Sequence, residues 1–425
     1  MPGLDGLDGT HGTSRPHGTP GPTRRARRLW RTAVAALACT AVIGAAGGAA
    51  ATAPASVTVR ATAPVTVPRP LPASVDGGAW QSGHVQGMAL DSRRGFLYFS
   101  FTNLLVKTDL KGRPVGSVTG FTGHLGDLDF NGKDGRVYGS LEYKAAKSFY
   151  IAIFDGDRIT RTGMDAQSTG VVSTVYLDKV VKDFTADMNG DGVFDGDTAA
   201  TPDHRYGCSG IDGVAFGPEF GSEHGEQRLT VAYGVYAGTG RTDNDHQVLL
   251  QYDVTRWKRY ERPLTEAAPH TSGPARVGGT YFAYTGNTRY GVQNLEYDAY
   301  RGTWLMAAYK GTKPDFPNYT LFAVDGAAKP VRGVVRGQRE PERGLLLPLL
   351  REGLHDAATG VYGWPATVRY GQYGLVSLDD GRYYVARNGT ATDGGVTRQT
   401  ARAELNTWTG RAPSPFAPVT GVRAG

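Results

Sequence analysis

The 425-residue chain has only two residues that could form a disulfide, Cys39 and Cys208, and it has only five methionines. Cys39 lies in an apolar run near the N-terminus. If export removes that run, Cys208 has no partner and no internal disulfide can form. No second apolar run of membrane-spanning length follows, so we expect no stable membrane insertion. Other interactions must hold the fold together.

Common catalytic signatures are also missing. The sequence has no G-x-S-x-G elbow, P-loop, H-E-x-x-H motif or dinucleotide fingerprint. GCSGIDG at 207–213 superficially resembles a nucleophile loop, but no strand-to-helix turn surrounds it, which favours a tight strand entry with Cys208 buried. The net charge of +6 owes much to an arginine-rich leader. The remainder is near neutral without a basic stripe, which argues against nucleic-acid binding.

Residues 1–55 have the pattern of a polar leader and a cleaved signal peptide. TRRARRLWR at 23–31 precedes an Ala-rich apolar run, and the small residues Ala53 and Ala55 predict cleavage after Ala55. We therefore expect a secreted, extracellular protein. Paired arginines leave a twin-arginine route open behind the favoured Sec route, and ALAC ending at Cys39 is only a weak lipoprotein box.

A short phrase recurs along a chain that is otherwise rich in strand and turn residues, with 60 Gly, 22 Tyr and 15 Phe. Its copies are HVQGMALD at 84–91, HLGDLDF at 124–130, GIDGVAFG at 210–217, GVQNLEYD at 291–298 and GQYGLVSLD at 371–379. Alternating strands and tight turns follow each copy. This pattern predicts an all-β protein, a β-propeller of five blades with the phrase as innermost strand. Six to eight blades stay open, because later copies lie farther apart than the first two.

The repeat also predicts details of the blades. Backbones should crowd at the axis at Gly87, Asp127, Gly213, Asn294 and Gly374. Fourth strands are expected at 113–118, 158–164, 257–264 and 331–337. The segments 165–207, 265–285 and 338–368 are interpreted as insertions or extra edge strands. Residues 56–78 are expected to be a linker or a ring-closing strand, 79–416 the propeller and 417–425 a flexible tail.

The segment DMNGDGVFDGD at 187–197 has the spacing of a calcium-binding loop. Oxygen donors occupy alternate positions: Asp187, Asn189, Asp191, the Val193 carbonyl and Asp195. Gly192 stands at the sharp-turn position, whereas Thr198 replaces the usual final Glu. We expect a structural calcium site within an insertion at about 185–198. The alternative is an acidic turn without an ion.

Polar residues gather where the inner strands begin, at one mouth of the central channel. The candidate catalytic residues are Asp127, Asp212, His84 and His124. The candidate substrate-binding residues, which include three Arg-Tyr pairs, are Gln86, Arg205, Tyr206, Arg289, Tyr290, Gln293, Asn294, Arg369, Tyr370 and Tyr373. The alternative interpretation is that these groups bond to neighbouring blades.

Two opposed carboxyl groups suit glycoside hydrolysis, whereas His, Tyr and Arg suit a polysaccharide lyase. The aromatic rim favours an extracellular glycan as the partner in either case. The architecture resembles the five-bladed propeller glycosidases but has none of their sequence motifs, so no catalytic residue is transferred. A non-catalytic binding propeller is the rival hypothesis. A calcium-dependent phosphoesterase or lactonase, with a second calcium ion at the axis, is a further one.

Overall fold

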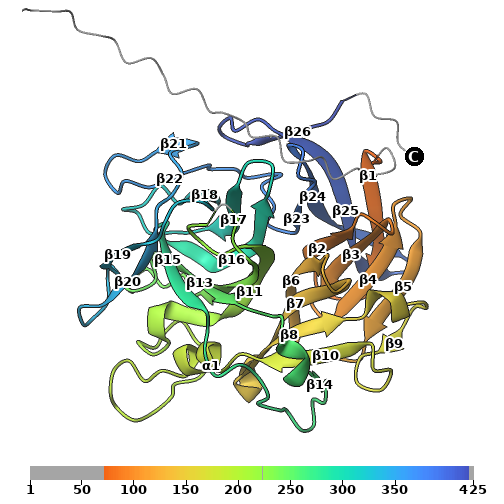
Figure 1. The fold of residues 1–425 in the computed structure, drawn as a ribbon, viewed down its shortest axis with the longest axis horizontal. Helices are drawn as coiled ribbons and strands as arrows, with labels where there is room; N and C mark the ends of the chain where they lie inside the picture. The colour runs from red at the N-terminus through yellow and green to blue at the C-terminus, as the bar shows by residue number, and fades with distance from the viewer. Residues whose placement is uncertain (1–70, 223, 421–425) are drawn as a thin grey trace, which may run out of the picture. The chain divides into compact units, whose positions relative to one another are not determined.

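The computed structural model describes residues 71–222 and 224–420 as five sheets arranged radially around a central axis (Figure 1). The predicted five-bladed β-propeller is confirmed. The predicted signal segment at 1–55, with Cys39, lies outside the described residues. Within the described ranges, no helix has the length and apolar character required to span a membrane.

The innermost strands correspond to the five copies of the repeated phrase: β2 (Val85–Asp91), β6 (His124–Asn131), β11 (Cys208–Pro218), β16 (Thr288–Asp298) and β23 (Leu375–Ser377). Antiparallel partners follow outward from each. They are β3 (Phe96–Phe101), β4 (Leu104–Asp109) and β5 (Pro114–Thr119) in blade 1; β7 (Arg136–Tyr143), β8 (Ser148–Phe154) and β10 (Val172–Tyr176) in blade 2; β12 (Gln227–Val235), β13 (His246–Tyr252) and β15 (Gly279–Tyr284) in blade 3; β17 (Thr303–Lys310) and β18 (Leu321–Asp325) in blade 4; and β24 (Arg382–Asp393) and β25 (Val396–Trp408) in blade 5.

Three of the predicted fourth strands instead lie on the preceding blade. β9 (Met164–Asp165) pairs with β5 of blade 1, and β14 (Arg262–Pro263) pairs with β10 of blade 2. β19 (Val331–Val334) pairs with β20 (Arg343–Leu347), which joins the outer edge of blade 3 through β15. An uncovered outer edge would leave backbone N–H and C=O groups unpaired. Blades 1, 2 and 3 are therefore each tied to the next blade by a returning strand, a feature that short-range patterns do not reveal.

Strands from both ends of the chain complete blade 5. β1 (Ser74–Trp80) and β26 (Phe416–Pro418) both pair with β25. The flexible tail was predicted to begin at residue 417, but β26 continues to Pro418. Phe416 is buried against Tyr383 and Trp408, and this contact holds the segment on the sheet. Backbone pairing closes the ring, so no disulfide is required.

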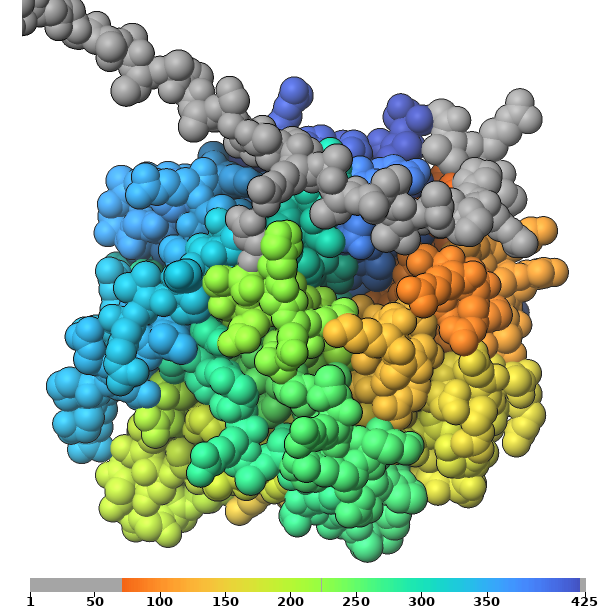
Figure 2. All heavy atoms as spheres, viewed as in Figure 1, coloured from red at the N-terminus to blue at the C-terminus, as the bar shows by residue number. Residues whose placement is uncertain are grey.

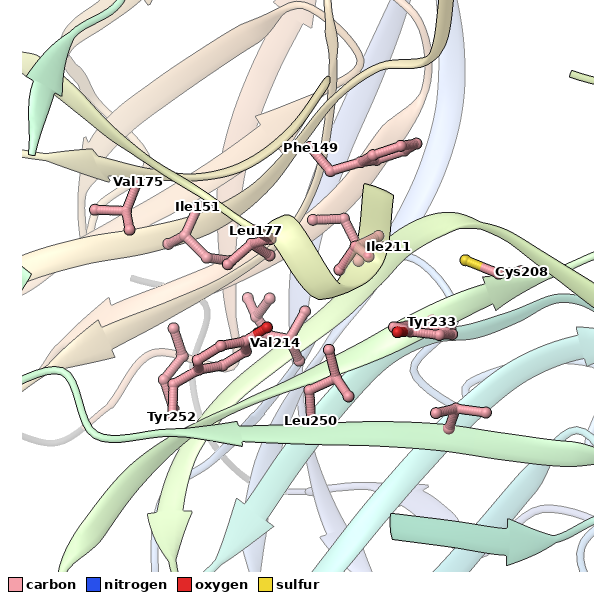
Figure 3. Close-up of a cluster of buried hydrophobic side chains, with 14 of the residues drawn as sticks. Phe149, Ile151, Val175, Leu177, Cys208, Ile211, Val214, Tyr233, Leu250 and Tyr252 are labelled. Atoms are coloured by element: carbon pink, nitrogen blue, oxygen red, sulfur yellow. The ribbon is translucent and has the colours of Figure 1, made fainter. Parts of the chain in front are cut away.

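The hydrophobic core lies between adjacent blades. Side chains of blade 2, such as Phe149 and Ile151, pack against Ile211 and Val214 of blade 3 (Figure 3). Cys208 lies in the same cluster, fully buried, as expected. The helix α1 (Asp178–Phe184) packs on this cluster. Around the rim, the β19–β20 hairpin projects from the edge, and the small hairpin of β21 (Leu354–His355) and β22 (Tyr362–Gly363) lies on the connection to blade 5 (Figure 1). In the space-filling view, blue atoms protrude at the lower left of the molecule (Figure 2).

At the axis the backbones are too close for regular ladders. A Cβ atom added at Gly87 would lie 2.6 Å from the Asp127 Cα, and one at Gly374 would lie 2.7 Å from the Met88 Cγ. The ladders of β2, β6, β11 and β16 with their second strands all shift register near this level. Such bulges leave backbone N–H groups without ladder partners. Those groups must be paired in another way.

Asp127 supplies that pairing across the axis. Its Oδ2 accepts hydrogen bonds from the N–H groups of Val214 in blade 3 (3.0 Å) and Leu295 in blade 4 (2.9 Å). Its Oδ1 accepts a hydrogen bond from the Leu128 N–H. Complete burial raises the pKa of Asp127 well above its usual range, while the three N–H groups oppose the shift. Asp127 therefore joins three blades.

Replacing Gly87 with Ala should destabilise the fold, because the new Cβ would overlap the backbone of blade 2. Overpacking of this kind costs about 1–3 kcal/mol. Gly132→Ala is the matched control: a Cβ there has no atom within 4 Å, and the change should stay within about 0.5 kcal/mol. Chemical denaturation of both variants measures the difference. Equal midpoints would contradict the crowded axis.

Asp127→Asn should lower the free energy of unfolding by about 1–3 kcal/mol. The amide keeps one acceptor oxygen and places an NH₂ group where the carboxylate accepted N–H bonds, so at least one buried N–H loses its partner. Thermal and urea denaturation report the loss. An unchanged midpoint would show that Asp127 does not join the blades.

Candidate functional site

A cavity of about 420 Å³ opens at the mouth where the inner strands begin. Its walls come from the inner strands and from the ends of the second strands, which reach the same level. The lining residues are His84, Gln86, His124, Glu142, Lys144, Ser209, Asp212, Gly234, Tyr290, Gln293 and Tyr309. Six of the predicted site residues are thereby brought together: His84, Gln86, His124, Asp212, Tyr290 and Gln293.

Two carboxyl groups from neighbouring blades open onto this cavity. Asp212 lies on β11, where its Oδ2 accepts a hydrogen bond of 2.8 Å from the Gln293 Nε2. Glu142 lies on β7, and its Oε1 accepts a hydrogen bond from the Ile211 N–H, next to Asp212. Gly210 makes this approach possible, because a Cβ at that position would overlap the Glu142 Oε1. The two carboxyls are thus fixed on strands of neighbouring blades.

Burial governs the protonation of both carboxyls. It raises the pKa of Glu142, and the Lys144 ammonium and the Ile211 N–H oppose the shift. Burial also raises the pKa of Asp212, and the negative charge of Glu142 raises it further. Like charges in a shared, poorly solvated site disfavour double ionisation. The arrangement therefore disfavours ionisation of both carboxyls at once.

Lys144 and His124 complete the polar wall around Glu142. The Lys144 Nζ and the His124 Nδ1 each lie 3.7 Å from the Glu142 Oε2. Burial disfavours the Lys144 ammonium, but Glu142, Asp197 and Asp212 outweigh it and raise the pKa of Lys144. Burial lowers the pKa of His124 to about 4, so this imidazole is neutral at pH 7. Lys144 therefore supplies positive charge beside the carboxyl pair.

Aromatic side chains form the opposite wall and the rim. The Tyr309 hydroxyl lies 3.3 Å from the His84 Nε2, and the His84 ring packs edge-on against Tyr373, with 5.7 Å between ring centroids. Tyr290 is 44% exposed, and the Arg289 guanidinium lies over its ring. Aromatic faces with polar edges are the groups that stack on sugar rings.

The other predicted mouth residues lie outside the cavity. Asp127, predicted to be catalytic, is buried at the axis with both oxygens bonded to backbone N–H groups. Asn294 is buried, and its Nδ2 donates to the Gln86 carbonyl of blade 1. Glu296, which was not among the predicted residues, lies on the same inner strand as Asn294 and lines a hollow of about 690 Å³ at the other end of the channel, with Asp129 and Asp379. Inner-strand position alone does not place a side chain in the mouth.

The three Arg-Tyr pairs, predicted to bind substrate together, are not equivalent. Arg205 and Tyr206 both bond to Glu342, and Tyr206 is buried. Tyr370 is buried too, and Arg369 pairs with Glu404. Each Arg-Tyr-Gly sequence instead contains left-handed backbone at or just before the start of an inner strand. Tyr206, Tyr290 and Arg369 have φ values of 60°, 63° and 52°, and Gly207, Gly291 and Gly371 also have positive φ. The repeat reflects turn geometry.

Five cavity residues were missed by the sequence prediction: Glu142, Lys144, Ser209, Gly234 and Tyr309. Ser209 belongs to the strand entry that was judged structural. The others lie on second strands or just after them, whereas the prediction considered inner strands. A signal was present, because Tyr-Lys recurs at the end of β7 and of β17, in LEYK at 141–144 and AAYK at 307–310.

The predicted calcium loop is closed by hydrogen bonds on its outer side. Asp187 accepts the N–H groups of Gly190, Asp191 and Gly192. Asn189 accepts the Asp191 N–H, and Asp191 accepts the Val193 N–H. Across the described ranges, no group of three or more His, Cys, Asp or Glu side chains is placed to hold a metal ion. Two of the predicted oxygen donors, the Asn189 side chain and the Val193 carbonyl, are not side chains of these four types.

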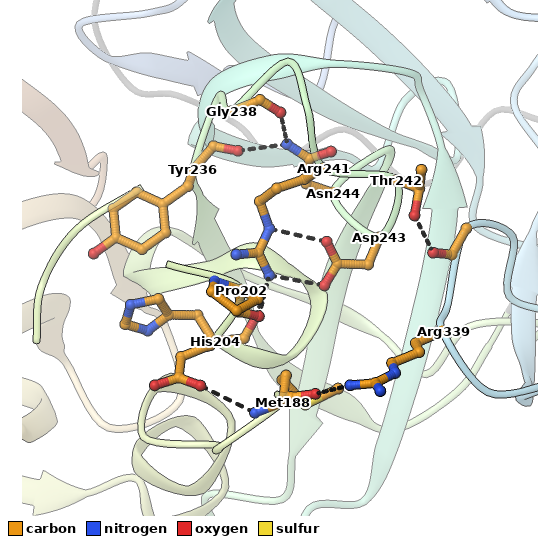
Figure 4. Close-up of polar contacts among 12 residues, drawn as sticks. Met188, Pro202, His204, Tyr236, Gly238, Arg241, Thr242, Asp243, Asn244 and Arg339 are labelled. Atoms are coloured by element: carbon orange, nitrogen blue, oxygen red, sulfur yellow. Dashed lines mark hydrogen bonds and ion pairs between the residues drawn. The ribbon is translucent and has the colours of Figure 1, made fainter. Parts of the chain in front are cut away.

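Arg241 anchors the insertion that carries this loop to blade 3 (Figure 4). Its guanidinium pairs with Asp243 and donates to the carbonyls of Thr201 and His204. A few residues earlier in the insertion, Asp197 accepts a hydrogen bond from the Tyr236 hydroxyl. Tyr236 follows β12 by one residue, so the insertion is joined to a strand that borders the cavity.

No protein-family model and no curated protein matches this chain. In fold it is similar to the Dos1 propeller, with a TM-score of 0.33 and 8% identity over 81% of this chain and 76% of that one. It is similar to Saccharomyces cerevisiae Sqt1, at TM-score 0.29 and 10% identity over 77% of this chain and 59% of that one. A third similar structure is the exo-beta-1,3-galactanase of Phanerochaete chrysosporium, at TM-score 0.34 and 9% identity over 82% of this chain and 70% of that one. These likenesses concern the fold alone.

Proposed function

We propose that this protein is a secreted glycoside hydrolase that cleaves an extracellular glycan in the mouth cavity. The observation that carries the proposal is the pair of buried carboxyls, Glu142 and Asp212, which open onto one cavity with an aromatic rim. Glycosidic bonds are cleaved by a protonated carboxyl acting with an ionised one. A pair in which double ionisation is disfavoured can supply one carboxyl in each form.

The surroundings assign the two roles. Glu142 accepts a backbone N–H and lies beside the Lys144 ammonium, and both contacts favour its ionised form. Asp212 accepts only the neutral Gln293 amide and faces the charge of Glu142. Asp212 is therefore the general acid, which protonates the leaving oxygen. Glu142 is the base or nucleophile, and Tyr290 and Tyr309 offer faces for the sugar ring.

A polysaccharide lyase is the second candidate, and the contact between His84 and Tyr309 favours it. Burial lowers the pKa of His84, so its neutral imidazole could accept the proton removed from a uronate. That chemistry also requires positive charge for the uronate carboxylate. Lys144 is the only cationic side chain in the described cavity wall, and Glu142 already pairs with it. Hydrolysis is therefore favoured.

Asp212→Asn and Glu142→Gln should each reduce turnover at least about 100-fold, because each removes one partner of the acid-base pair. Release of reducing ends from a panel of plant and microbial polysaccharides measures turnover, and circular dichroism verifies folding. Glu340→Gln, an exposed carboxyl outside the cavity, is the control.

If the wild type binds glycan without turnover and the carboxyl variants only bind it more weakly, the binding propeller would be selected instead. Ultraviolet absorption from a new C=C bond, sensitive to His84→Ala, would select the lyase. Full turnover in both carboxyl variants would refute the assigned pair.

We further propose that the loop at 187–197 binds calcium as a structural ion. Asp187, Asn189, Asp191, the Val193 carbonyl and Asp195 supply oxygen donors at the alternating spacing of a calcium loop. Hydrogen bonds within the loop hold the first three of these side chains in place. The ion would rigidify an insertion that is joined to the cavity through Tyr236.

Millimolar calcium should raise the melting temperature of the wild type above that in EDTA, because an ion that binds only the folded state stabilises it. Asp187→Ala should abolish this rise, since it removes the donor that organises the loop. Asp393→Asn, on an exposed hairpin distant in sequence, is the control. An identical response to calcium in wild type and Asp187→Ala would exclude the site.

A further inference from the structure

The β24–β25 hairpin extends past its blade on the side of the mouth. β23 has 3 residues, whereas β24 has 12 and β25 has 13. Leu375, where β23 begins, pairs with Val385, and the hairpin ladder continues to the pair of Asp393 with Val396. Inner strands begin at the mouth, so the hairpin beyond Val385 projects from that face (Figure 1).

The two faces of this projection differ in chemistry. Residues opposite one another in an antiparallel pair lie on the same face. One face carries Trp80, Asn388, Thr390, Thr392, Thr397 and Gln399, and we call it the polar ladder face. The other face carries the charged residues Arg387, Asp393, Arg398 and Arg402. The polar ladder face thus combines uncharged hydrogen-bonding groups with one aromatic ring.

The polar ladder face is turned toward the strand that begins beside His84. The Asn388 Oδ1 accepts a hydrogen bond of 3.2 Å from the Val85 N–H, and its Nδ2 donates to Gln399. Trp80 precedes His84 by four residues, so their Cα atoms lie within about 14 Å of each other. The face therefore continues outward from the cavity wall.

We infer that the polar ladder face binds the part of the glycan that extends out of the mouth cavity. This inference rests on the proposed function and specifies the substrate class: a polymer of neutral sugars. Neutral sugars offer hydroxyls to Thr, Asn and Gln side chains and an apolar ring face to Trp80. A polyuronate would require cations, and the arginines of this hairpin lie on its other face.

The test uses Thr390→Ala combined with Gln399→Ala, and Thr400→Ala as the matched control. Thr400 neighbours Gln399 on the same strand but lies on the opposite face. Binding is measured as retardation in native gels that contain arabinogalactan, xylan or β-glucan, with polygalacturonate as the charged probe. Retardation by a neutral polymer should weaken at least about fivefold in the double variant, from two lost hydrogen bonds, and stay unchanged in the control.

Three results would overturn the inference: no retardation of the wild type, equal retardation of the double variant, or retardation by polygalacturonate alone. A shift in oligomeric state in the double variant, seen by sedimentation, would instead assign the face to a second copy of the chain. Hydrolysis of short oligosaccharides is scored separately. If the wild type hydrolyses the oligosaccharides and the double variant is retarded as strongly as the wild type, only the inference about the polar ladder face is refuted. If the wild type is retarded but hydrolyses nothing, only the proposed hydrolase activity is refuted.

Discussion

Crowding of five inner strands around one axis is the constraint on which the rest of this structure depends. The strands cannot keep regular ladders there, and their bulges release N–H groups that must be paired in a dry interior. Side chains of neighbouring blades provide the acceptors: Asp127 for Val214 and Leu295, and Asp129 for Phe216. At the mouth, Glu142 accepts a hydrogen bond from the Ile211 N–H in the same way. The carboxyls at the centre are therefore first of all a structural requirement.

The candidate site lies where carboxyls that pair backbone N–H groups also line the mouth cavity. Asp127 is fully enclosed and its oxygens are used by three blades, so no oxygen is free for a ligand. The Glu142 Oε1 likewise accepts a backbone N–H from a neighbouring blade, whereas its Oε2 lies near Lys144 and His124 on the cavity wall. Desolvation holds the pKa values of Glu142 and Asp212 high in both cases. The same burial that ties the blades thus supplies carboxyls suited to acid-base chemistry.

Sequence reasoning could identify the fold because one phrase recurs at each inner strand, and glycines such as Gly87 mark the axis. Outer strands such as β14 could not be identified, since they return to a preceding blade through pairings remote in sequence. His84, His124 and Asp212 were predicted in the mouth because they share a strand entry. Asp127 lies below the mouth in which it was predicted, because its depth depends on the bulge, and Glu142 was not predicted there because it lies on a second strand. Patterns give strand order, whereas depth follows from three-dimensional packing.

The central claim is that the glycan is cleaved between Glu142 and Asp212, while Asp127 only joins the blades. A crystal structure of the Asp212→Asn variant with a bound oligosaccharide tests it most directly. The account predicts a sugar ring in the mouth cavity against Tyr290 and Tyr309, with the glycosidic oxygen beside position 212. An oligosaccharide bound instead in the hollow lined by Asp129 and Glu296, at the far end of the channel, would contradict it.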